Sequence, residues 1–500
     1  MGSARVTVAA LLLCAGAARA DDTNYQNYVV GQRALGMGGA FTALADDGAG
    51  AYYNPAGIAM SPETTLSASL SVYGVERRAL RGAVGPPVDV QAARPDLVSS
   101  NVPTIPTTVG FAYKFGRRYG DGIKRFGISY SVFEPYHSSF DFAGSTQIFP
   151  APPDDFDVEI HERDKTVQQG PSFAMRITPR LSMGLAAFHV YRDTSWSSTV
   201  RQVSERDSDL LAEYFDEQRA SITRSVHSLL LRAGARFDLT ERWKLGLALT
   251  APSITLVGSG TAHTSSTTHE AGCVSPPRCV RYEDFGGDVD ADSRTPLSVR
   301  AGVAYTIEDR LTVALDLSYN APLTYDPFDV GNDSAKFGET GPVVLSDLRR
   351  EQVFNANVGG ELLLSNVTLR AGFFTNFSSA PEVERAAFAT APRIHMLGAT
   401  LSAGYRWKSR TISLGVLYSF GSGHASALTP QDPAATLNQP YGPVEERRDY
   451  VYFFISGAQE ALKDTAVDWI KRKTRGKPAE PAQKKTPASQ PASQPARGRE

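Results

Sequence analysis

The 500-residue sequence lacks several features that would place it in a common class of protein. Lys and Arg number 51 against 53 Asp and Glu, and this near balance gives no basic footprint for nucleic acid. Beyond residue 20 there is no run of eighteen or more apolar residues, so a transmembrane helix is excluded. No GxSxG, HExxH or phosphate-loop motif occurs, which indicates that the chain is not an enzyme.

Cysteine is also scarce, with three in the chain. Residues 1–20 predict a signal peptide, because a basic residue precedes an apolar stretch and Ala18-Arg19-Ala20 forms a small-residue cleavage site. Cys14 lies within that segment, which leaves Cys273 and Cys279 in the exported chain. An exported pair at this spacing predicts a disulfide between them. Two cysteines do not complete a metal site, and the sequence predicts no metal and no cofactor.

What the sequence has in abundance is two-residue periodicity. From Leu297 to Tyr305, apolar side chains alternate with small or charged ones, which is the pattern of a strand with one apolar face. A soluble sandwich and a membrane barrel both produce this alternation, with the apolar face toward a second sheet or toward lipid. Fourteen such segments are predicted, at 65–75, 104–115, 124–133, 167–177, 181–200, 221–238, 243–257, 294–306, 310–320, 351–364, 366–378, 393–407, 410–421 and 447–456.

The connections between these segments separate the two alternatives. Short connections, such as 178–180, alternate with long ones, such as 134–166. An even strand number with short turns at one end and long loops at the other is typical of outer-membrane barrels. Trp243 and Trp407 lie beside short turns, where an interfacial aromatic girdle belongs. We therefore predict an all-β fold, a 14-stranded antiparallel transmembrane β-barrel over residues 65–456.

A glycine-rich segment before the first strand needs a separate place. Residues 31–60 are too interrupted by glycine for a long helix and too apolar for an exposed linker. Since a barrel of this size encloses more space than its side chains fill, we predict that residues 21–64 form an N-terminal lumenal hatch, or plug. The hatch is defined by Gly36, Gly38, Gly39, Asp46, Asp47, Asn54, Pro55, Ala56 and Gly57.

This segment also carries a family resemblance. The run from Gly36 to Phe41, the Ala45-Asp46-Asp47 step and Asn54-Pro55-Ala56-Gly57 resemble the N-terminal hatch of the FadL/TodX family of outer-membrane transporters for hydrophobic compounds. PorV-like barrels of secretion systems carry similar glycine motifs, so a barrel scaffold or secretion-shuttle component is an alternative. An open porin for polar solutes is a second alternative.

The resemblance implies a location and a route. It implies a multi-pass barrel in the Gram-negative cell outer membrane, inserted by the barrel-assembly machinery and surrounded by outer-membrane lipid. Its partners would be hydrophobic small molecules, long-chain fatty acids or hydrocarbons, taken up passively. They would be captured by the loops, bound in the lumen and released laterally into the membrane as the hatch moves. The family's lateral opening arises from a kink in the third strand, where Gly127 and Gly122 are the available weak points.

Two further groups of residues are candidates for ligand contact. A helix is predicted from Asp209 to Arg219 in the third long loop, and its apolar face is either a capture surface or rim packing. Charged residues on the polar strand face would point into the lumen, either as an anchor for a carboxylate head group or as partners of lumenal and hatch acids. The capture residues are Leu210, Leu211, Tyr214 and Phe215, and the lumenal residues are Arg232, Arg236, Arg300, Asp316, Glu361, Arg370 and Arg406.

The chain continues past the last predicted strand. Residues 457–474 predict a short amphipathic periplasmic helix, and residues 475–500, with an ASQPASQPA repeat, predict a disordered Pro/Ala/Lys-rich tail. The segment between Lys471 and Lys477 is basic. Contact of this tail with a periplasmic partner or the cell wall is one interpretation, and a solvated tail is the other.

Overall fold

The computed structural model describes most of the chain between residues 23 and 460. The predicted signal peptide, both cysteines of the predicted disulfide, and the predicted tail lie outside the described residues. Within the described part, no helix is both long and apolar enough to cross a membrane. The described ranges are 23–26, 28–61, 64–82, 96–102, 108–147, 154–205, 213–269, 280–308, 310–329, 348–383, 391–425 and 443–460.

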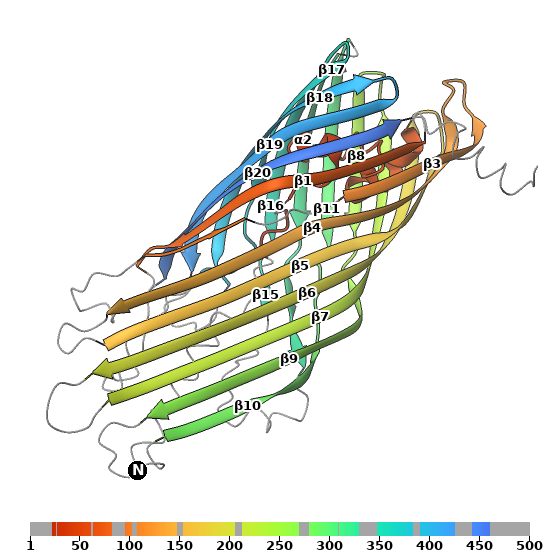
Figure 1. The fold of residues 1–500 in the computed structure, drawn as a ribbon. Helices are drawn as coiled ribbons and strands as arrows, with labels where there is room; N and C mark the ends of the chain where they lie inside the picture. Colours follow the sequence, from red (N-terminus) through yellow and green to blue (C-terminus); the bar gives the residue numbers. More distant parts are fainter. Residues whose placement is uncertain are drawn as a thin grey trace, which may run out of the picture. The chain divides into compact units, whose positions relative to one another are not determined.

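The strands form one closed antiparallel barrel (Figure 1). Its eighteen hydrogen-bonded segments make up a 14-stranded wall, because β8 and β9 together form one wall strand, as do β10 and β11, while β2 and β14 are short additions. The sheet closes where β1 pairs with β20 on one side and β3 on the other. The sheet segments are β1 Thr65–Leu80, β2 Leu97–Asn101, β3 Thr108–Arg118, β4 Lys124–Gln147, β5 Asp154–Arg176, β6 Leu181–Glu205, β7 Glu213–Asp238, β8 Trp243–Thr250, β9 Ile254–His269, β10 Val280–Ala291, β11 Ser298–Ile307, β12 Leu311–Asn320, β14 Phe328–Asp329, β16 Val353–Leu364, β17 Val367–Asn376, β18 Arg393–Trp407, β19 Arg410–Ala425 and β20 Val444–Glu460, and a separate pair is formed by β13 Leu323–Tyr325 and β15 Leu348–Arg350.

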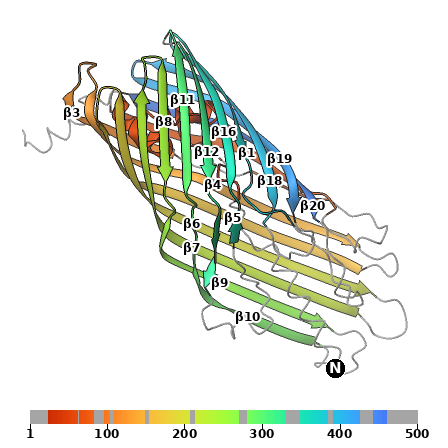
Figure 2. The same cartoon turned by 180° about the vertical axis from the view of Figure 1, so that it is seen from behind.

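One side of the wall is longer than the sequence predicts. β4, β5, β6 and β7 contain 24, 23, 25 and 26 residues, so the predicted loop 134–166 is largely strand. The view from behind brings the shorter strands β11 and β12, with 10 residues each, to the front (Figure 2). The two-residue alternation continues through the long strands, but outward side chains such as Asp141 and His161 are polar. Where these strands extend beyond the membrane, their outer face contacts water and carries polar residues. The alternation of outward apolar residues with inward polar residues, which identifies a membrane strand in the sequence, is therefore lost there.

The inner face of these strand extensions carries an apolar cluster next to buried polar and charged residues. Phe140, Phe142 and Ile160 are buried there together with Trp196 and Ile222. This second apolar cluster was missed from the sequence, although its signal was present as alternating aromatic and branched residues. The long wall therefore has a mixed inner lining, with one apolar cluster, at the long-loop end of the barrel.

Two predicted helices are wrong where the structure describes them. β7 begins at Glu213, so Tyr214 and Phe215 belong to a strand, and Leu210 and Leu211 lie outside the described residues. β20 runs to Glu460, and residues 457–460 pair with β1 instead of beginning the amphipathic helix. In both places the hydrogen bonds of the barrel ladder outweigh a local helical spacing of apolar residues.

The N-terminal segment lies inside the barrel, where its helices, red in Figure 1, are enclosed by the wall. It contains α2 Gln32–Gly36, α3 Gly50–Tyr53 and a short 3₁₀ helix, η2 Pro55–Met60. Its side chains form the main apolar cluster together with wall residues such as Phe133 and Phe188. This position agrees with the predicted hatch, and we use that name for residues 23–61.

Candidate functional site

A belt of inward-facing wall glycines holds the hatch. On Gly110, an added Cβ would lie 2.0 Å from the carbonyl oxygen of Gly48, and on Gly359 it would lie 2.2 Å from that of Met37. Real Cβ atoms do not approach so closely, so only glycine lets the two backbones touch. The glycine belt consists of Gly110, Gly127, Gly184, Gly234, Gly246, Gly302, Gly359 and Gly372, each of which faces a hatch residue.

Gly127 belongs to this belt and does not open the wall. β4 pairs without interruption across Gly127, opposite Lys114 of β3 and Ala174 of β5. An added Cβ at Gly127 would lie 3.0 Å from Cγ2 of Ile58 in the hatch. The predicted weak point at Gly127 is therefore corrected, since this glycine makes room for the hatch where β4 is paired on both sides, and the irregularity of β4 lies between Phe133 and Tyr136.

Two polar side chains fix the middle of the hatch to the wall. Oδ2 of Asp316 on β12 accepts hydrogen bonds from the backbone N–H groups of Phe41 and Thr42, at 2.9 and 2.8 Å, and from the Thr42 hydroxyl at 2.6 Å. Nδ2 of Asn54 donates to the carbonyl oxygens of Thr42 and of Ala235 on β7, at 3.0 and 2.9 Å. Asp316 is thus a partner of the hatch backbone, and Asn54 joins two parts of the hatch to each other and to the wall.

A chain of charges links the hatch to β16 and β17. Arg33 of α2 pairs with Asp46 at 2.9 Å and with Glu361 at 2.7 Å, and Glu361 also pairs with Arg370 at 2.6 Å. Burial beside the Asp46 carboxylate raises the pKa of Asp47 to about 6. Arg370 and Glu361 are therefore occupied by each other and by the hatch.

The remaining hatch residues have local structural roles. Gly38 and Gly39 have φ values of +61° and +82°, a conformation that glycine adopts without strain. Gly36 lies against the side chain of Arg370, and Gly57 leaves room for the carbonyl oxygen of Ala45. Pro55 and Ala56 begin the 3₁₀ helix η2, for which Asn54 is the N-cap.

A pocket of about 140 Å³ with a mixed polar and apolar lining lies in the lumen beside α3. Nε of Arg232 donates to Oγ1 of Thr250 at 3.0 Å, and its guanidinium carbon lies 5.0 Å from the ring centroid of Tyr52. The guanidinium group of Arg232 also donates to the backbone carbonyl oxygen of Tyr52 in the hatch. The guanidinium carbon of Arg300 lies 5.2 Å from the ring centroid of Tyr53. Neither arginine forms an ion pair with a carboxylate in the described part of the chain, so the pocket contains two positive charges that could attract an anion.

The other two predicted lumenal arginines differ from this pair. Arg236 is buried and pairs with Asp238 at 3.0 Å, and it also donates to the carbonyl oxygen of Leu44 in the hatch. Arg406 is exposed near the short-turn end of β18 and is not buried in the lumen. An inward register position close to a strand end is thus insufficient to place a side chain in the lumen.

The wall ladder is interrupted between β5 and β6. Pairing stops at Gln169 and resumes at Ser172, so Gly170 and Pro171 have no partner in β6. Proline has no N–H to donate to a ladder, so Pro171 accounts for a gap in the pairing at this position. A cavity of about 750 Å³ with a mostly apolar lining covers the outer face of this break, and its walls come from β3 through β8 and include Arg232.

A buried carboxyl that sequence reasoning missed lies on β1. Glu76 accepts a hydrogen bond from the Tyr28 hydroxyl at 2.9 Å and a second one from the Tyr452 hydroxyl. Tyr28 belongs to the hatch and Tyr452 to β20, so the carboxyl fixes the hatch beside the seam that closes the barrel. In the sequence, the acidic residue at an inward position of the first strand was the available sign of this contact.

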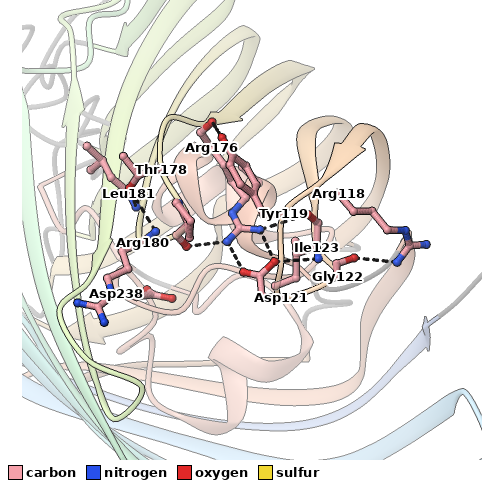
Figure 3. A network of polar contacts seen from close by, with 12 residues as sticks. Arg118, Tyr119, Asp121, Gly122, Ile123, Arg176, Thr178, Arg180, Leu181 and Asp238 are labelled. Carbon is pink, nitrogen blue, oxygen red and sulfur yellow. Dashed lines mark hydrogen bonds and ion pairs between the residues drawn. The ribbon is translucent and has the colours of Figure 1, made fainter.

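A polar network joins two of the short turns (Figure 3). Arg176 donates to Oδ1 of Asp121 at 3.1 Å and to the carbonyl oxygen of Ile123 at 3.3 Å. The Tyr119 hydroxyl donates to the carbonyl oxygen of Arg176 at 3.1 Å. The charge of Asp121 is therefore compensated by Arg176, while Arg118 lies on the other side of the same turn in Figure 3.

No family model matches the sequence, and no curated protein matches it. Among solved structures, the chain is similar to a FadL homologue of Pseudomonas aeruginosa, with 13% identity, a TM-score of 0.56, and 87% of this chain and 99% of the other covered. The toluene transporter TodX of P. putida gives the same identity, score and coverage. The monoaromatic hydrocarbon channel CymD, also 13% identical, gives a TM-score of 0.52 over 88% of this chain and 99% of its own. The chain thus folds as a 14-stranded antiparallel β-barrel similar to those of the FadL homologue and TodX, with its N-terminal segment inside the barrel.

Proposed function

We propose that the protein is a passive outer-membrane channel for hydrophobic molecules, which it binds in the lumen and releases sideways into the membrane. The observation that carries this proposal is the position of Arg232. It lines both the lumenal pocket and the apolar cavity outside the break at Gly170 and Pro171. A ligand that moves between the two would cross the wall where Gly170 and Pro171 lack paired residues in β6, so fewer ladder hydrogen bonds have to be broken there.

The hatch favours a sideways route over a straight one. Its backbone touches the wall at the glycine belt, so a direct path toward the short-turn end is blocked. Hatch movement in this proposal is a local shift of α3, because Tyr52 and Tyr53 line the lumenal pocket. A greasy molecule that leaves through the wall enters lipid without returning to water, which the hydrophobic effect favours.

The preferred cargo is a long-chain fatty acid, and a neutral hydrocarbon is the less favoured one. Arg232 and Arg300 offer donors to a carboxylate, and charge-assisted hydrogen bonds of this kind are stronger than neutral ones. Capture is assigned to the long-loop end of the barrel, with its inner apolar cluster and the segment that contains Leu210, Leu211, Tyr214 and Phe215. The similarity to a FadL homologue and to the toluene transporter TodX supports hydrophobic cargo in general.

The lateral route is tested by closing the break with a disulfide. We would combine Pro171→Cys with Ala187→Cys, which occupy opposite register positions, in a background of Cys273→Ser and Cys279→Ser. Oxidation should abolish uptake of a labelled fatty acid by cells that lack their own transporter, and reduction should restore it. The matched control is Val167→Cys with Tyr191→Cys, a pair in the intact part of the same ladder. Unchanged uptake after complete oxidation at the break would disprove lateral release there.

The cargo is tested at Arg300, which contacts the rings of Tyr52 and Tyr53 and, within the part of the chain that the structure describes, makes no hydrogen bond to the hatch. Arg300→Gln should lower fatty-acid binding by about 10-fold, as expected for the loss of one charged hydrogen bond. Binding of a neutral hydrocarbon should not change. Equal losses for both ligands would contradict a head-group role, and free passage of a polar dye would favour a porin.

A further inference from the structure

The short-turn end of the barrel carries exposed positive charge at most of its turns. Exposed cations occur at the turns that join β3 to β4, β5 to β6, β7 to β8, β11 to β12 and β18 to β19. This is unexpected for a chain whose formal net charge is −2. We name this set the basic collar and represent it by Arg118, Arg125, Arg180, Arg242, Arg310 and Lys408.

The acids of the same turns do not cancel this charge. Asp121 is already paired with Arg176, and Asp238 is paired with Arg236. Glu241 and Glu308 are the exposed acids that remain in the described part of these turns. Figure 3 shows the consequence at one turn, where the Asp121 carboxylate points to Arg176 and the Arg118 guanidinium lies away from it.

The collar lies at the level of an aromatic girdle. The Arg125 guanidinium carbon is 5.4 Å from the ring centroid of Phe126, and Nζ of Lys408 is 5.6 Å from that of Trp407. Trp407 is 59% exposed on the outer wall. Tryptophan and tyrosine side chains of this kind sit at the head-group level of a membrane. Cations that extend over such rings keep their stems in the apolar layer and their charges among the lipid phosphates.

We propose that the basic collar binds the phosphate groups of anionic phospholipids in the periplasmic leaflet of the outer membrane. The short turns of outer-membrane barrels face the periplasm, and the leaflet on that side is built of phospholipid. Clustered cations at a membrane surface attract anionic lipids, and this attraction adds up over several side chains. The collar is continuous with the lipid-facing wall, so phospholipid head groups are its immediate neighbours. Its function would be to select the lipid around the barrel and to fix the depth of the barrel in the membrane.

The test compares spin-labelled phosphatidylglycerol with spin-labelled phosphatidylcholine at the boundary of the reconstituted protein. The wild-type protein should retain phosphatidylglycerol several-fold more strongly, and high salt should remove the preference because it shortens the screening length from about 10 Å to about 3 Å. The collar variant combines Arg118→Gln, Arg125→Gln, Arg242→Gln and Lys408→Gln, and should bind the two lipids equally.

A control variant carries the same number of exposed arginine substitutions at the opposite end, Arg77→Gln, Arg163→Gln, Arg201→Gln and Arg219→Gln, and should keep the wild-type preference. A collar variant that keeps the preference would overturn the proposal. So would a wild-type protein with no preference, or one that binds cell-wall fragments or a periplasmic protein through these cations instead of lipid. If the collar variant does not fold, the salt dependence of the wild-type preference still decides the question.

Discussion

Gly48 of the hatch and Gly110 of β3 lie backbone against backbone. An added Cβ on Gly48 would come within 2.2 Å of the Gly110 carbonyl oxygen, and one on Gly110 within 2.0 Å of the Gly48 carbonyl oxygen. The same kind of contact recurs around the barrel at the glycine belt. The hatch is therefore fitted to the wall by the absence of side chains at these positions.

Gly359→Ala should loosen the hatch, because the new methyl group would lie 2.2 Å from the Met37 carbonyl oxygen. Overpacking of this kind costs about 1–3 kcal/mol. We expect faster proteolysis of the hatch and passage of a polar dye through reconstituted protein. Gly360→Ala is the matched control. An added Cβ at Gly360 would lie 3.9 Å from the Thr312 carbonyl oxygen, an ordinary van der Waals contact, and should leave both readouts unchanged. Equal behaviour of the two variants would show that the belt does not hold the hatch.

Replacement of Asn54-Pro55-Ala56 by three alanines should abolish uptake and leave the barrel folded. The change removes the Asn54 amide that donates to Thr42 and Ala235, and it leaves these two buried carbonyl oxygens without that donor. An unsatisfied buried polar group costs about 1–3 kcal/mol. Fatty-acid uptake reports the function, and the heat-dependent shift in gel mobility reports the barrel. Uptake at the wild-type level would mean that this part of the hatch occupies space in the lumen and has no role in transport.

The hatch should bind more tightly at mildly acidic pH. The pKa of Asp47 is about 6 in the folded chain against 3.8 for an ordinary aspartate, so the folded hatch binds the proton more strongly than the unfolded chain does. Stability is therefore gained as the pH falls through 6, by about 1 kcal/mol between pH ~7.5 and pH ~5. Resistance of the hatch to proteolysis should follow this curve. Asp47→Asn should make the resistance independent of pH in this range, and a persistent dependence would assign the titration to another group.

Cys273 and Cys279 remain predicted to form a disulfide that staples the long loop between β9 and β10. Under non-reducing conditions neither cysteine of the exported protein should react with a thiol-alkylating reagent. After reduction, both should react, which mass spectrometry of the loop peptide would detect. Alkylation without prior reduction would contradict the bridge. The Cys273→Ser, Cys279→Ser variant should retain the fold, because β9 and β10 pair with each other from His269 and Val280 onward.

Some of the site was visible in the sequence because the relevant pattern is local. Asn54-Pro55-Ala56-Gly57 has turn chemistry of its own, and its caps and turns form as expected in η2. Arg232 and Arg236 were recognised as inward because strand alternation places every second residue on one face. The sequence shows that Pro171 has no N–H to donate. It does not show whether the missing hydrogen bond belongs to the ladder with β4 or to the ladder with β6, because that depends on how the strands are paired in the barrel.

The sequence by itself determined the number of wall strands, the order of short turns and long loops, and the presence of a glycine-rich segment with no place on the wall. These features follow from two-residue periodicity and turn composition, which are local properties of the chain. Only the tertiary structure decided that Gly127 makes room for Ile58, that Glu361 is shared by Arg33 and Arg370, and that Arg232 and Arg300 have no carboxylate partner among the described residues. Each of these depends on contacts between strands far apart in sequence, whose positions are fixed only when the barrel closes around the hatch.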